Sequence, residues 1–183
     1  MTTEFDTRVL TWVTDIREPW LTVFFHVVTI LGSLPVVALI TAAAATVAVR
    51  SGRRWDAVLG AVTVVTAWLL MRGLKMLAGR DRPPPELSVV EVGYYSLPSG
   101  HALMIATVAV VVGAIALRNR WTWPLLAVVV IFVGISRVYL GAHWPTDVIA
   151  GWAIGTIWAF ACVALSHALR PTEFRVARRH NPL

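Results

Sequence analysis

The region from residue 121 to residue 165 reads WTWPLLAVVVIFVGISRVYLGAHWPTDVIAGWAIGTIWAFACVAL, and it gives the clearest indication of the architecture. It holds two apolar runs, residues 121–136 and 148–165, separated by a short segment that carries charged side chains. Each run is slightly shorter than the roughly 20 residues that a transmembrane helix needs, so flanking aromatic residues must complete the spans. The region therefore predicts two membrane helices joined by a short polar turn at one membrane surface.

Three further apolar runs precede this region, at residues 20–49, 57–71 and 102–117. The whole chain of 183 residues is 57% hydrophobic and 14% charged, with a mean hydropathy of +0.71. A soluble domain of this size can rarely hide so much apolar surface from water. We therefore predict an all-α fold, a multi-pass transmembrane helical bundle of about five spans. A bend near Gly32, inside the longest run, leaves room for a sixth membrane segment.

The chain is predicted to form a single membrane domain over residues 1–183, in three parts. Residues 20–169 form the transmembrane bundle, and residues 170–183 form a basic cytoplasmic tail. Residues 3–18 mix apolar and charged side chains, and the apolar positions 5, 9, 12, 13 and 16 share one helical face. This periodicity predicts an amphipathic, interfacial helix lying on the membrane, with a frayed soluble tail as the alternative.

Arginines gather in the loops on one side of the predicted bundle and in the tail, and the positive-inside rule makes that side cytoplasmic. They are Arg50, Arg53, Arg54, Arg118, Arg120, Arg170, Arg175, Arg178 and Arg179. The opposite, extracytoplasmic side receives residues 75–97 and 140–147, whose charges need another explanation. The net charge of +6 does not indicate a nucleic-acid partner, because the charges lie at predicted helix ends. The single cysteine, Cys162, cannot form an intramolecular disulfide.

Lys75 and the pair Arg82-Pro83 form the first of three blocks that are candidates for a functional site. Lys75 is the only lysine among 16 basic residues, which indicates that a compact ammonium group is needed at this position. Arg82 follows seven residues later, two helical turns, so both side chains would face one way if the helix persists to Pro83. The alternative is a pair of basic side chains that snorkel to the surface from a helix end.

Pro98-Ser99-Gly100-His101 forms the second block, at the start of a predicted span. Proline favours the first helical turn, and the backbone N–H groups of Ser99, Gly100 and His101 can converge on an anion there. Gly100 leaves out a Cβ that would block close approach, and His101 brings a titratable proton beside this pocket. A serine that simply caps the helix is the alternative.

Ser136-Arg137 and, further along the chain, His143 and Asp147 form the third block. Arg137 offers a planar, bidentate grip on phosphate. Asp147 lies four residues after His143, a spacing at which its carboxylate can accept the imidazole Nδ1–H and leave Nε2 as a nucleophile. The alternative is that Asp147 caps a helix beside a histidine that has no catalytic role.

Together the blocks read KxxxxxxRP, PSGH and SRxxxxxHxxxD, and they resemble the three motifs of the type 2 phosphatidic acid phosphatase superfamily. The sequence matches every specified position, and the resemblance covers roughly residues 55–165. A six-span bacterial relative would carry one more helix before the amphipathic segment. The sequence predicts no such helix, and this difference is the main departure from the family pattern.

The resemblance implies that His143 attacks phosphorus and forms a phosphohistidine, while Asp147 orients its ring. His101 would protonate the leaving oxygen and then activate water. The phosphate oxygens would be bound by the remaining groups of the motifs, namely Lys75, Arg82, Arg137, Ser99 and the Gly100 N–H. The resemblance implies that the reaction needs neither a metal ion nor another cofactor.

We therefore predict a metal-independent membrane lipid phosphatase, whose partners are a lipid phosphate substrate and membrane lipids. Its active site would lie on the extracytoplasmic side of a bacterial plasma membrane. The preferred substrate hypothesis is a polyprenyl diphosphate, undecaprenyl diphosphate, hydrolysed to the monophosphate; phosphatidylglycerophosphate and phosphatidic acid are the alternatives. Two further hypotheses are transfer of the phosphoryl group to another lipid, and a lipid transporter or scramblase without catalysis. The sequence makes no prediction of the oligomeric state.

Overall fold

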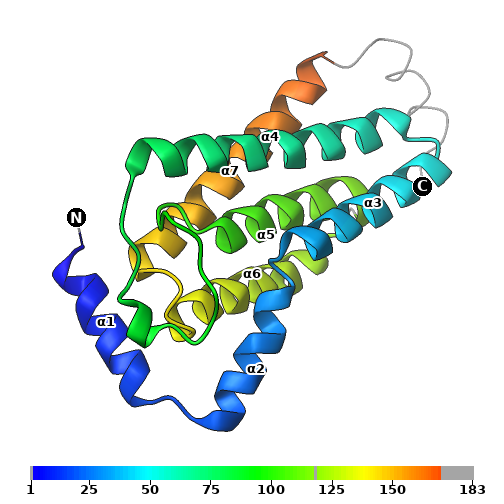
Figure 1. Ribbon diagram of the computed structural model, residues 1–183. Coiled ribbons are helices and arrows are strands. Elements are labelled where there is room, and N and C mark those ends of the chain that lie inside the picture. Colours follow the sequence, from blue (N-terminus) through cyan, green and yellow to red (C-terminus); the bar gives the residue numbers. More distant parts are fainter. Residues whose placement is uncertain (1, 118, 170–183) are drawn as a thin grey trace.

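The computed structural model of the protein describes residues 2–117 and 119–169, and these residues form helices without a β-strand (Figure 1). The all-helical class predicted from the sequence is confirmed. The predicted cytoplasmic tail, residues 170–183, and Arg118 lie outside the described residues. The elements are α1 (Glu4–Asp15), α2 (Pro19–Ile30), α3 (Leu34–Arg50), α4 (Arg54–Ala78), the short 3₁₀ turn η1 (Pro85–Leu87), α5 (Gly100–Val111), the π-helical η2 (Val112–Leu117), α6 (Thr122–Tyr139) and α7 (Pro145–Leu169).

Three helices are long and apolar enough to cross a membrane, judged by length and composition: α4, α6 and the Pro145–Ser166 part of α7. The α2–α3 pair passes the same test as one broken span, bent by 48°. Helix α5 is shorter, with 12 residues and a six-residue π-helical continuation in η2. Three or four spans therefore meet this criterion in the described part of the chain, and the predicted count of five stays a prediction.

The break between α2 and α3 covers residues 31–33 and confirms the predicted bend near Gly32. Pro35 lies in the first turn of α3, where its missing N–H removes no helical hydrogen bond. A Cβ on Gly32 would lie 2.7 Å from Val133 Cγ1 and 2.9 Å from His101 Cβ, which is too close for a side chain to fit. The glycine therefore lets the break pack directly against the start of α5 and against α6.

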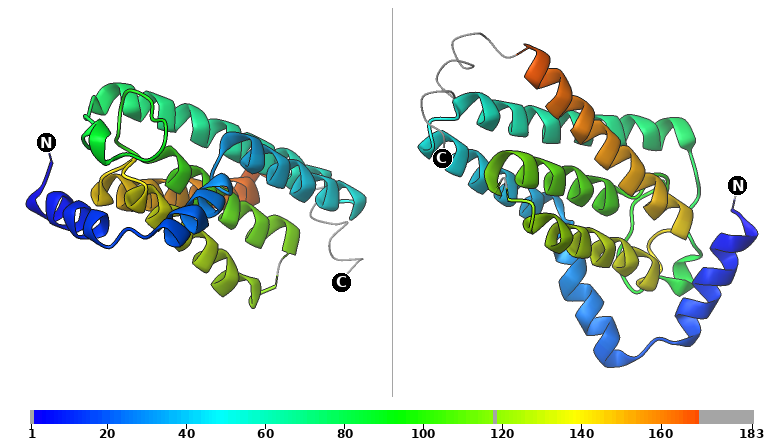
Figure 2. Two further views of the ribbon diagram at one scale, coloured as in Figure 1. Left: turned by 60° about the horizontal axis from the view of Figure 1, so that its bottom comes forward. Right: turned by 180° about the vertical axis from the view of Figure 1, so that it is seen from behind.

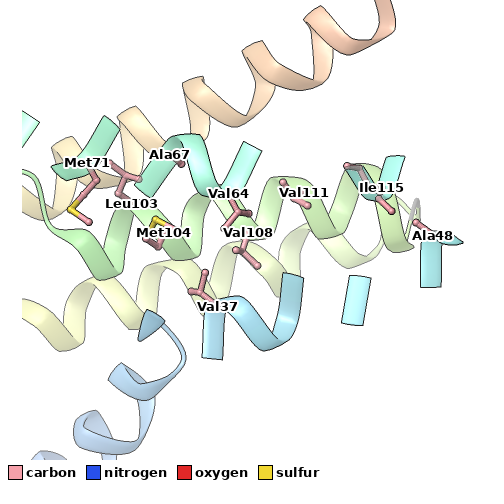
Figure 3. Packing of buried hydrophobic residues seen from close by; sticks show 11 residues of the cluster. Val37, Ala48, Val64, Ala67, Met71, Leu103, Met104, Val108, Val111 and Ile115 are labelled. Carbon is pink, nitrogen blue, oxygen red and sulfur yellow. The ribbon is translucent and has the colours of Figure 1, made fainter. Parts of the chain in front are cut away.

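Helix α5 forms the centre of the bundle, and every side chain from residue 102 to residue 111 is buried. Helices α3, α4, α6 and α7 all pack against it. Helix α7 approaches it closely at Gly151 and Gly155, where a Cβ would lie 2.8 Å from the Ser99 carbonyl oxygen and 2.3 Å from the Leu103 carbonyl oxygen. Because α5 is enclosed in this way, its first turn is held in place at one end of the bundle. Figure 3 shows the apolar cluster around it, made of Val37, Ala48, Ala57, Val64, Ala67, Met71, Leu103, Met104, Val108, Val111 and Ile115.

The outer surface of the bundle carries large apolar side chains on each of its long helices. Exposed examples are Leu39 on α3, Val62 on α4, Ile131 on α6 and Ile157 on α7. Monomeric soluble proteins expose such side chains only in limited patches, whereas lipid chains accept them over the whole surface. The surface therefore supports a membrane protein, as the composition predicts.

Helix α1 lies beside the end of the bundle that holds the α6–α7 turn, and it contacts both of these helices (Figures 1 and 2). It is slightly shorter than the helix predicted over residues 3–18. Its buried side chains are Asp6, Leu10 and Val13, whereas Phe5 and Trp12 of the predicted apolar face are exposed. The helix thus has one face docked on the protein and one exposed apolar face, and its place on the membrane surface stays a prediction.

Candidate active site

The three sequence motifs meet at one end of the bundle, where α4 ends, α5 begins and α6 turns into α7 (Figure 1). Backbone hydrogen bonds join the loop between α4 and α5 to its surroundings. Ser96 N donates to the Arg80 carbonyl oxygen at 2.8 Å, and Val89 N donates to the Leu140 carbonyl oxygen at 3.0 Å. The loop is therefore held both to itself and to the α6–α7 turn, and the motifs come together although they are far apart in the sequence.

Helix α4 does not continue to Pro83, so the condition under which Lys75 and Arg82 would face one way on a single helix is not met. Gly79 ends the helix in the left-handed region, at φ 56°, and its N–H donates to the Lys75 carbonyl oxygen at 3.1 Å. A glycine in this conformation commonly terminates helices because it has no Cβ to clash. Both cations still act electrostatically on His143. The course of the loop after Gly79, instead of helical spacing, brings them to one site.

The start of α5 offers one backbone donor fewer than the sequence predicts. The Ser99 N–H donates to the Asp147 carbonyl oxygen at 3.0 Å, so it is not available to an anion. The N–H groups of Gly100 and His101 remain candidates for binding an anion. A Cβ on Gly100 would make only an ordinary contact with Met71 Sδ, at 3.6 Å. Packing within the protein therefore does not require glycine here, which favours the approach of a ligand as the reason for it.

His143 lies in the α6–α7 turn and is 2% exposed. Its Nδ1 lies 3.5 Å from Asp147 Oδ2 and 3.3 Å from the Ser96 hydroxyl, and its Nε2 lies 3.3 Å from Arg82 Nη1. Burial lowers the pKa of His143 to about 3; the hydrogen bond to Asp147 opposes this shift, and the charges of nearby cations, Arg82 first, add to it. The imidazole is therefore neutral at physiological pH. With its proton on Nδ1, it has a lone pair on Nε2.

Asp147 is fully buried, and hydrogen-bond donors surround its carboxylate. Arg80 Nη1 donates to Oδ1 at 2.6 Å, Trp144 N donates to Oδ2 at 3.0 Å, and the Ser96 hydroxyl also donates to Oδ2. Trp144 directly precedes α7, so the carboxylate caps this helix and faces His143 at the same time. The helix cap and the group beside the histidine, which the sequence treats as alternatives, are one and the same side chain.

Three basic side chains that the sequence assigns to phosphate binding act electrostatically on His143: Lys75, Arg82 and Arg137. None of them takes part in the ion pairs found in the described portion of the chain. Lys75 Nζ donates to the Tyr95 carbonyl oxygen at 2.8 Å, and Arg82 Nη1 donates to the Ala142 carbonyl oxygen at 2.5 Å. Neutral carbonyl groups therefore hold these cations in place, and neither cation has an ion-pair partner among the described residues.

Several polar atoms near these cations are buried without a partner. Arg137 donates through Nη1 to Thr29 Oγ1 at 2.7 Å, but its Nε has no acceptor. The Ser99 hydroxyl and Arg82 Nε are also unpartnered. Burial lowers the pKa of Arg82, because a cation removed from water is less stable, although Asp147 opposes the shift. Buried donor atoms that lack an acceptor, next to cations that lack an ion-pair partner, favour binding of an anion that carries several oxygen atoms.

His101 belongs to the same charged cluster. Its side chain packs against the break at Gly32, and the charges of Arg137, Arg82 and Lys75 act on it as they act on His143. The sequence predicts His101 as the acid and His143 as the nucleophile. The structure brings both under the influence of one set of cations.

Sequence reasoning missed three polar side chains of this site, Ser96, Asp6 and Thr29, and Arg80 falls at an unspecified position of the first motif. Arg80 bridges Asp147 and Asp6, and Thr29 binds Arg137. Arg80 lies two residues before Arg82 in the first motif, which could have drawn attention to it. Asp6 shares a helical face with Leu10 and Val13, and it forms a capping box with Thr3 at the start of α1; neither local signal points to the site.

The sequence model of the PAP2 superfamily matches residues 59–171. The chain belongs to this superfamily. The match contains all three motifs and confirms the resemblance that they indicate.

Similar proteins carry the names of phosphatases. An undecaprenyl-diphosphatase of Sulfolobus acidocaldarius is 45% identical over 71 residues, which cover 39% of this chain and 34% of the relative. Phosphatidylglycerophosphatase B of Bacillus subtilis is 31% identical over 157 residues, which cover 79% of this chain and 75% of the relative. The crystal structure of a transmembrane PAP2-type phosphatidylglycerolphosphate phosphatase from Bacillus subtilis matches with a TM-score of 0.76 at 28% identity, covering 90% of this chain and 86% of that one. These names support a lipid phosphate phosphatase and differ in the substrate.

Proposed function

We propose that the protein hydrolyses the terminal phosphate from a membrane lipid through a phosphohistidine on His143. The observation that carries this proposal is the setting of the His143 ring, which is buried and neutral, with a carboxylate near Nδ1 and a cation near Nε2. A neutral imidazole is nucleophilic at the nitrogen that carries no proton. The carboxylate at the other nitrogen stabilises the positive charge that the ring gains on attack.

In the first step, His143 Nε2 attacks phosphorus, and the bond from phosphorus to the oxygen on the lipid side breaks. His101 donates a proton to that oxygen, and the phosphoryl group remains on Nε2. In the second step, His101 accepts a proton from water, the water oxygen attacks phosphorus, and the bond from phosphorus to Nε2 breaks. Inorganic phosphate leaves, and both histidines return to their starting states.

Lys75, Arg82 and Arg137 would bind the oxygens of the transferred phosphoryl group. In phosphoryl transfer, negative charge is spread over these oxygens in the transition state, so fixed positive charge around them lowers the barrier. The unpartnered Ser99 hydroxyl and the Gly100 N–H would add two neutral donors. These groups supply the positive field that a metal ion supplies in other phosphatases.

The position of the site suits a lipid substrate. It lies at the end of an apolar bundle, so a bound phosphate would sit at the level of the lipid headgroups while its chain stays in hydrocarbon. Arg50, Arg53 and Arg54 lie at the opposite end, which under the positive-inside rule supports a site on the extracytoplasmic side of a bacterial plasma membrane. The exposed apolar face of α1 would then lie in the membrane interface.

The proposed substrate is a polyprenyl diphosphate, undecaprenyl diphosphate, hydrolysed to the monophosphate. The loop over residues 84–97 carries Glu86 and Glu91, which disfavour a further strongly anionic headgroup beyond the phosphate pocket. The cations around His143 could hold the second phosphate of a diphosphate beside the first. Phosphatidylglycerophosphate is the second candidate, since similarity to the Bacillus subtilis enzyme extends over 79% of the chain.

The test is a side-by-side measurement of kcat/KM in mixed micelles on undecaprenyl diphosphate, phosphatidylglycerophosphate and phosphatidic acid, with His143→Ala as the inactive control. The highest value is expected for undecaprenyl diphosphate. A glycerophospholipid cleaved more than about tenfold better, a gap of roughly 1.4 kcal/mol in transition-state binding, would overturn the substrate assignment. Folded protein that releases phosphate from none of the three lipids would instead favour a transporter or scramblase.

A further inference from the structure

Asp6, on the N-terminal helix α1, is fully buried against the start of α7. Its carboxylate accepts hydrogen bonds from Thr146 N at 3.0 Å, from Thr146 Oγ1 at 2.8 Å and from Arg80 Nη2 at 2.6 Å. Burial raises the pKa of Asp6, but the hydrogen bonds, first that from Thr146 N, lower it to about 2. A charged carboxylate that stands outside the three motifs therefore reaches the residue next to Asp147.

Arg80 links the two carboxylates. Its Nη2 donates to Asp6 at 2.6 Å and its Nη1 donates to Asp147 Oδ1 at 2.6 Å, and its side chain is 8% exposed. Arg82, two residues later, contacts no carboxylate within the described ion pairs and faces His143 Nε2. The two arginines of one short segment thus serve opposite sides of the histidine. Arg80 is occupied by carboxylates, and Arg82 has its charge free for substrate.

The charge of Arg80 creates a conflict that Asp6 resolves. A single arginine bonded to Asp147 would neutralise the carboxylate that His143 needs when its ring becomes positive. Arg80 would also draw Oδ1 toward itself, and only the hydrogen bonds from Trp144 N and the Ser96 hydroxyl to Oδ2 would oppose this pull. A second carboxylate on the far side of the guanidinium offsets its charge and fixes its position, and the hydrogen bonds from Thr146 hold that carboxylate to the start of α7.

We propose that Asp6 is a positioning residue for the phosphatase reaction: through Arg80 it holds the Asp147 carboxylate in place against His143 Nδ1 and preserves its negative charge. The inference rests on the proposed function of His143. It makes helix α1 part of the catalytic unit, although no motif residue lies on that helix. The route runs through four side chains in the order Asp6, Arg80, Asp147 and His143.

The first test compares Asp6→Asn with Glu4→Gln in purified protein. Asparagine keeps an oxygen that can accept from Thr146, and it replaces the charged oxygen that accepts from Arg80 and Thr3 by an amide NH2 group. Glu4, on the same helix, pairs with Arg8 at the surface. Asp6→Asn should lower kcat by about tenfold, the scale seen when a group that orients a functional side chain is removed. KM should change less than about twofold, because the phosphate-binding cations are untouched. Glu4→Gln should behave as wild type.

The second test is a double-mutant cycle with Arg80→Gln. If Asp6 acts through Arg80, the double variant should be no slower than Arg80→Gln alone. If the kcat of the double variant fell by the product of the two single effects, the proposed route through Arg80 would be overturned. A wild-type kcat in Asp6→Asn, or a loss of kcat that matches a fall in the folded fraction, would overturn it too. Wild-type phosphate release together with an inactive His143→Ala shows that the proposed function holds whatever the Asp6 variants do, so the two failures are distinguishable.

Discussion

The two nitrogen atoms of the His143 ring face regions of opposite character. On the Nδ1 side, two carboxylates, Asp147 and Asp6, share the guanidinium of Arg80, and each of them accepts several hydrogen bonds. On the Nε2 side, Arg82 Nη1 stands 3.3 Å away and pairs with no carboxylate among the described ion pairs, while the charges of Arg137 and Lys75 also act on the ring. The carboxylates of the first region find their partners within the protein, whereas we propose that the second region finds its partner in the substrate phosphate.

This difference separates catalysis from stability. A buried cation without a counter-charge lowers the stability of the folded state, so its removal should cost activity and leave stability unchanged or improved. A member of a satisfied network supports its neighbours, so its removal should cost both. Variants on the two sides of the ring therefore test the comparison directly.

The largest effect is expected from the loss of a phosphate-binding cation, in Arg137→Gln. Loss of a cation that stabilises the transition state should lower kcat/KM by about a hundredfold. The melting temperature in detergent should stay the same or rise, because glutamine can still donate to Thr29 and the buried charge is gone. Arg120→Gln, an exposed arginine just before α6 at the other end of the bundle, is the control. Activity within a factor of about three of wild type, far below the usual cost of losing such a donor, would argue against the assignment.

A smaller effect is expected on the Nδ1 side, from Ser96→Ala. The Ser96 hydroxyl contacts both His143 and Asp147, so its loss should lower kcat by about tenfold, with little change in KM. The melting temperature should fall, because a buried network loses one of its donors. Ser88→Ala is the matched control, since its hydroxyl donates to the Val90 carbonyl oxygen within the same loop. An equal loss in both variants would mean that the loop, and not the contact with His143, matters.

The sequence predicts the phosphate-binding cations better than the network of carboxylates on the Nδ1 side of the ring. Lys75, Arg82 and Arg137 stand out as charges at the ends of apolar runs, and they need only converge to form a pocket. The contact of Asp6 with Arg80 joins residues 74 positions apart, and its contact with Thr146 joins residues 140 positions apart. Periodicity and capping rules describe neighbours along the chain, so contacts of this kind appear only once the helices are packed.

The same reasoning explains which fold predictions succeed. The bend near Gly32 has a local cause, a glycine with a proline three residues later, and the bend is present in the structure. Lys75 and Arg82 do not share one helix, because Gly79 ends α4. The sequence alone does not show that this glycine adopts a left-handed φ. The short α5 can sit at the centre of the bundle because its neighbours cover it, which no property of its own sequence specifies.

A modest effect is expected from acid. The folded-state pKa of Asp6, about 2, lies below its ordinary value of 3.8, so the carboxylate stabilises the fold above about pH 4. That contribution is lost as the pH falls from about 4 to about 2, where the folded protein must also take up the proton. Melting temperatures measured across this range should fall more steeply for wild type than for Asp6→Asn. Parallel curves would show that Asp6 does not carry a stabilising charge.

The smallest effect is expected from a chelator. The positive charge around His143 comes from Lys75, Arg82 and Arg137, so activity after treatment with EDTA should stay within the error of the assay. A metal-dependent phosphatase treated in the same way serves as the positive control. Loss of activity that is restored by adding magnesium or zinc would show that the Nε2 side is completed by a metal ion instead of by the substrate alone.

The most direct test of the central claim, that Nε2 of His143 receives the phosphoryl group, is to trap the intermediate. Protein mixed with a lipid diphosphate radiolabelled in its terminal phosphate is quenched in alkali, in which phosphohistidine survives, and the labelled peptide is sequenced by mass spectrometry. The account predicts label on His143, more of it in His101→Ala if water activation becomes slow, and none in His143→Ala. Label on any other residue, or product formed in a single turnover with no label on the wild-type protein at any time, would contradict it.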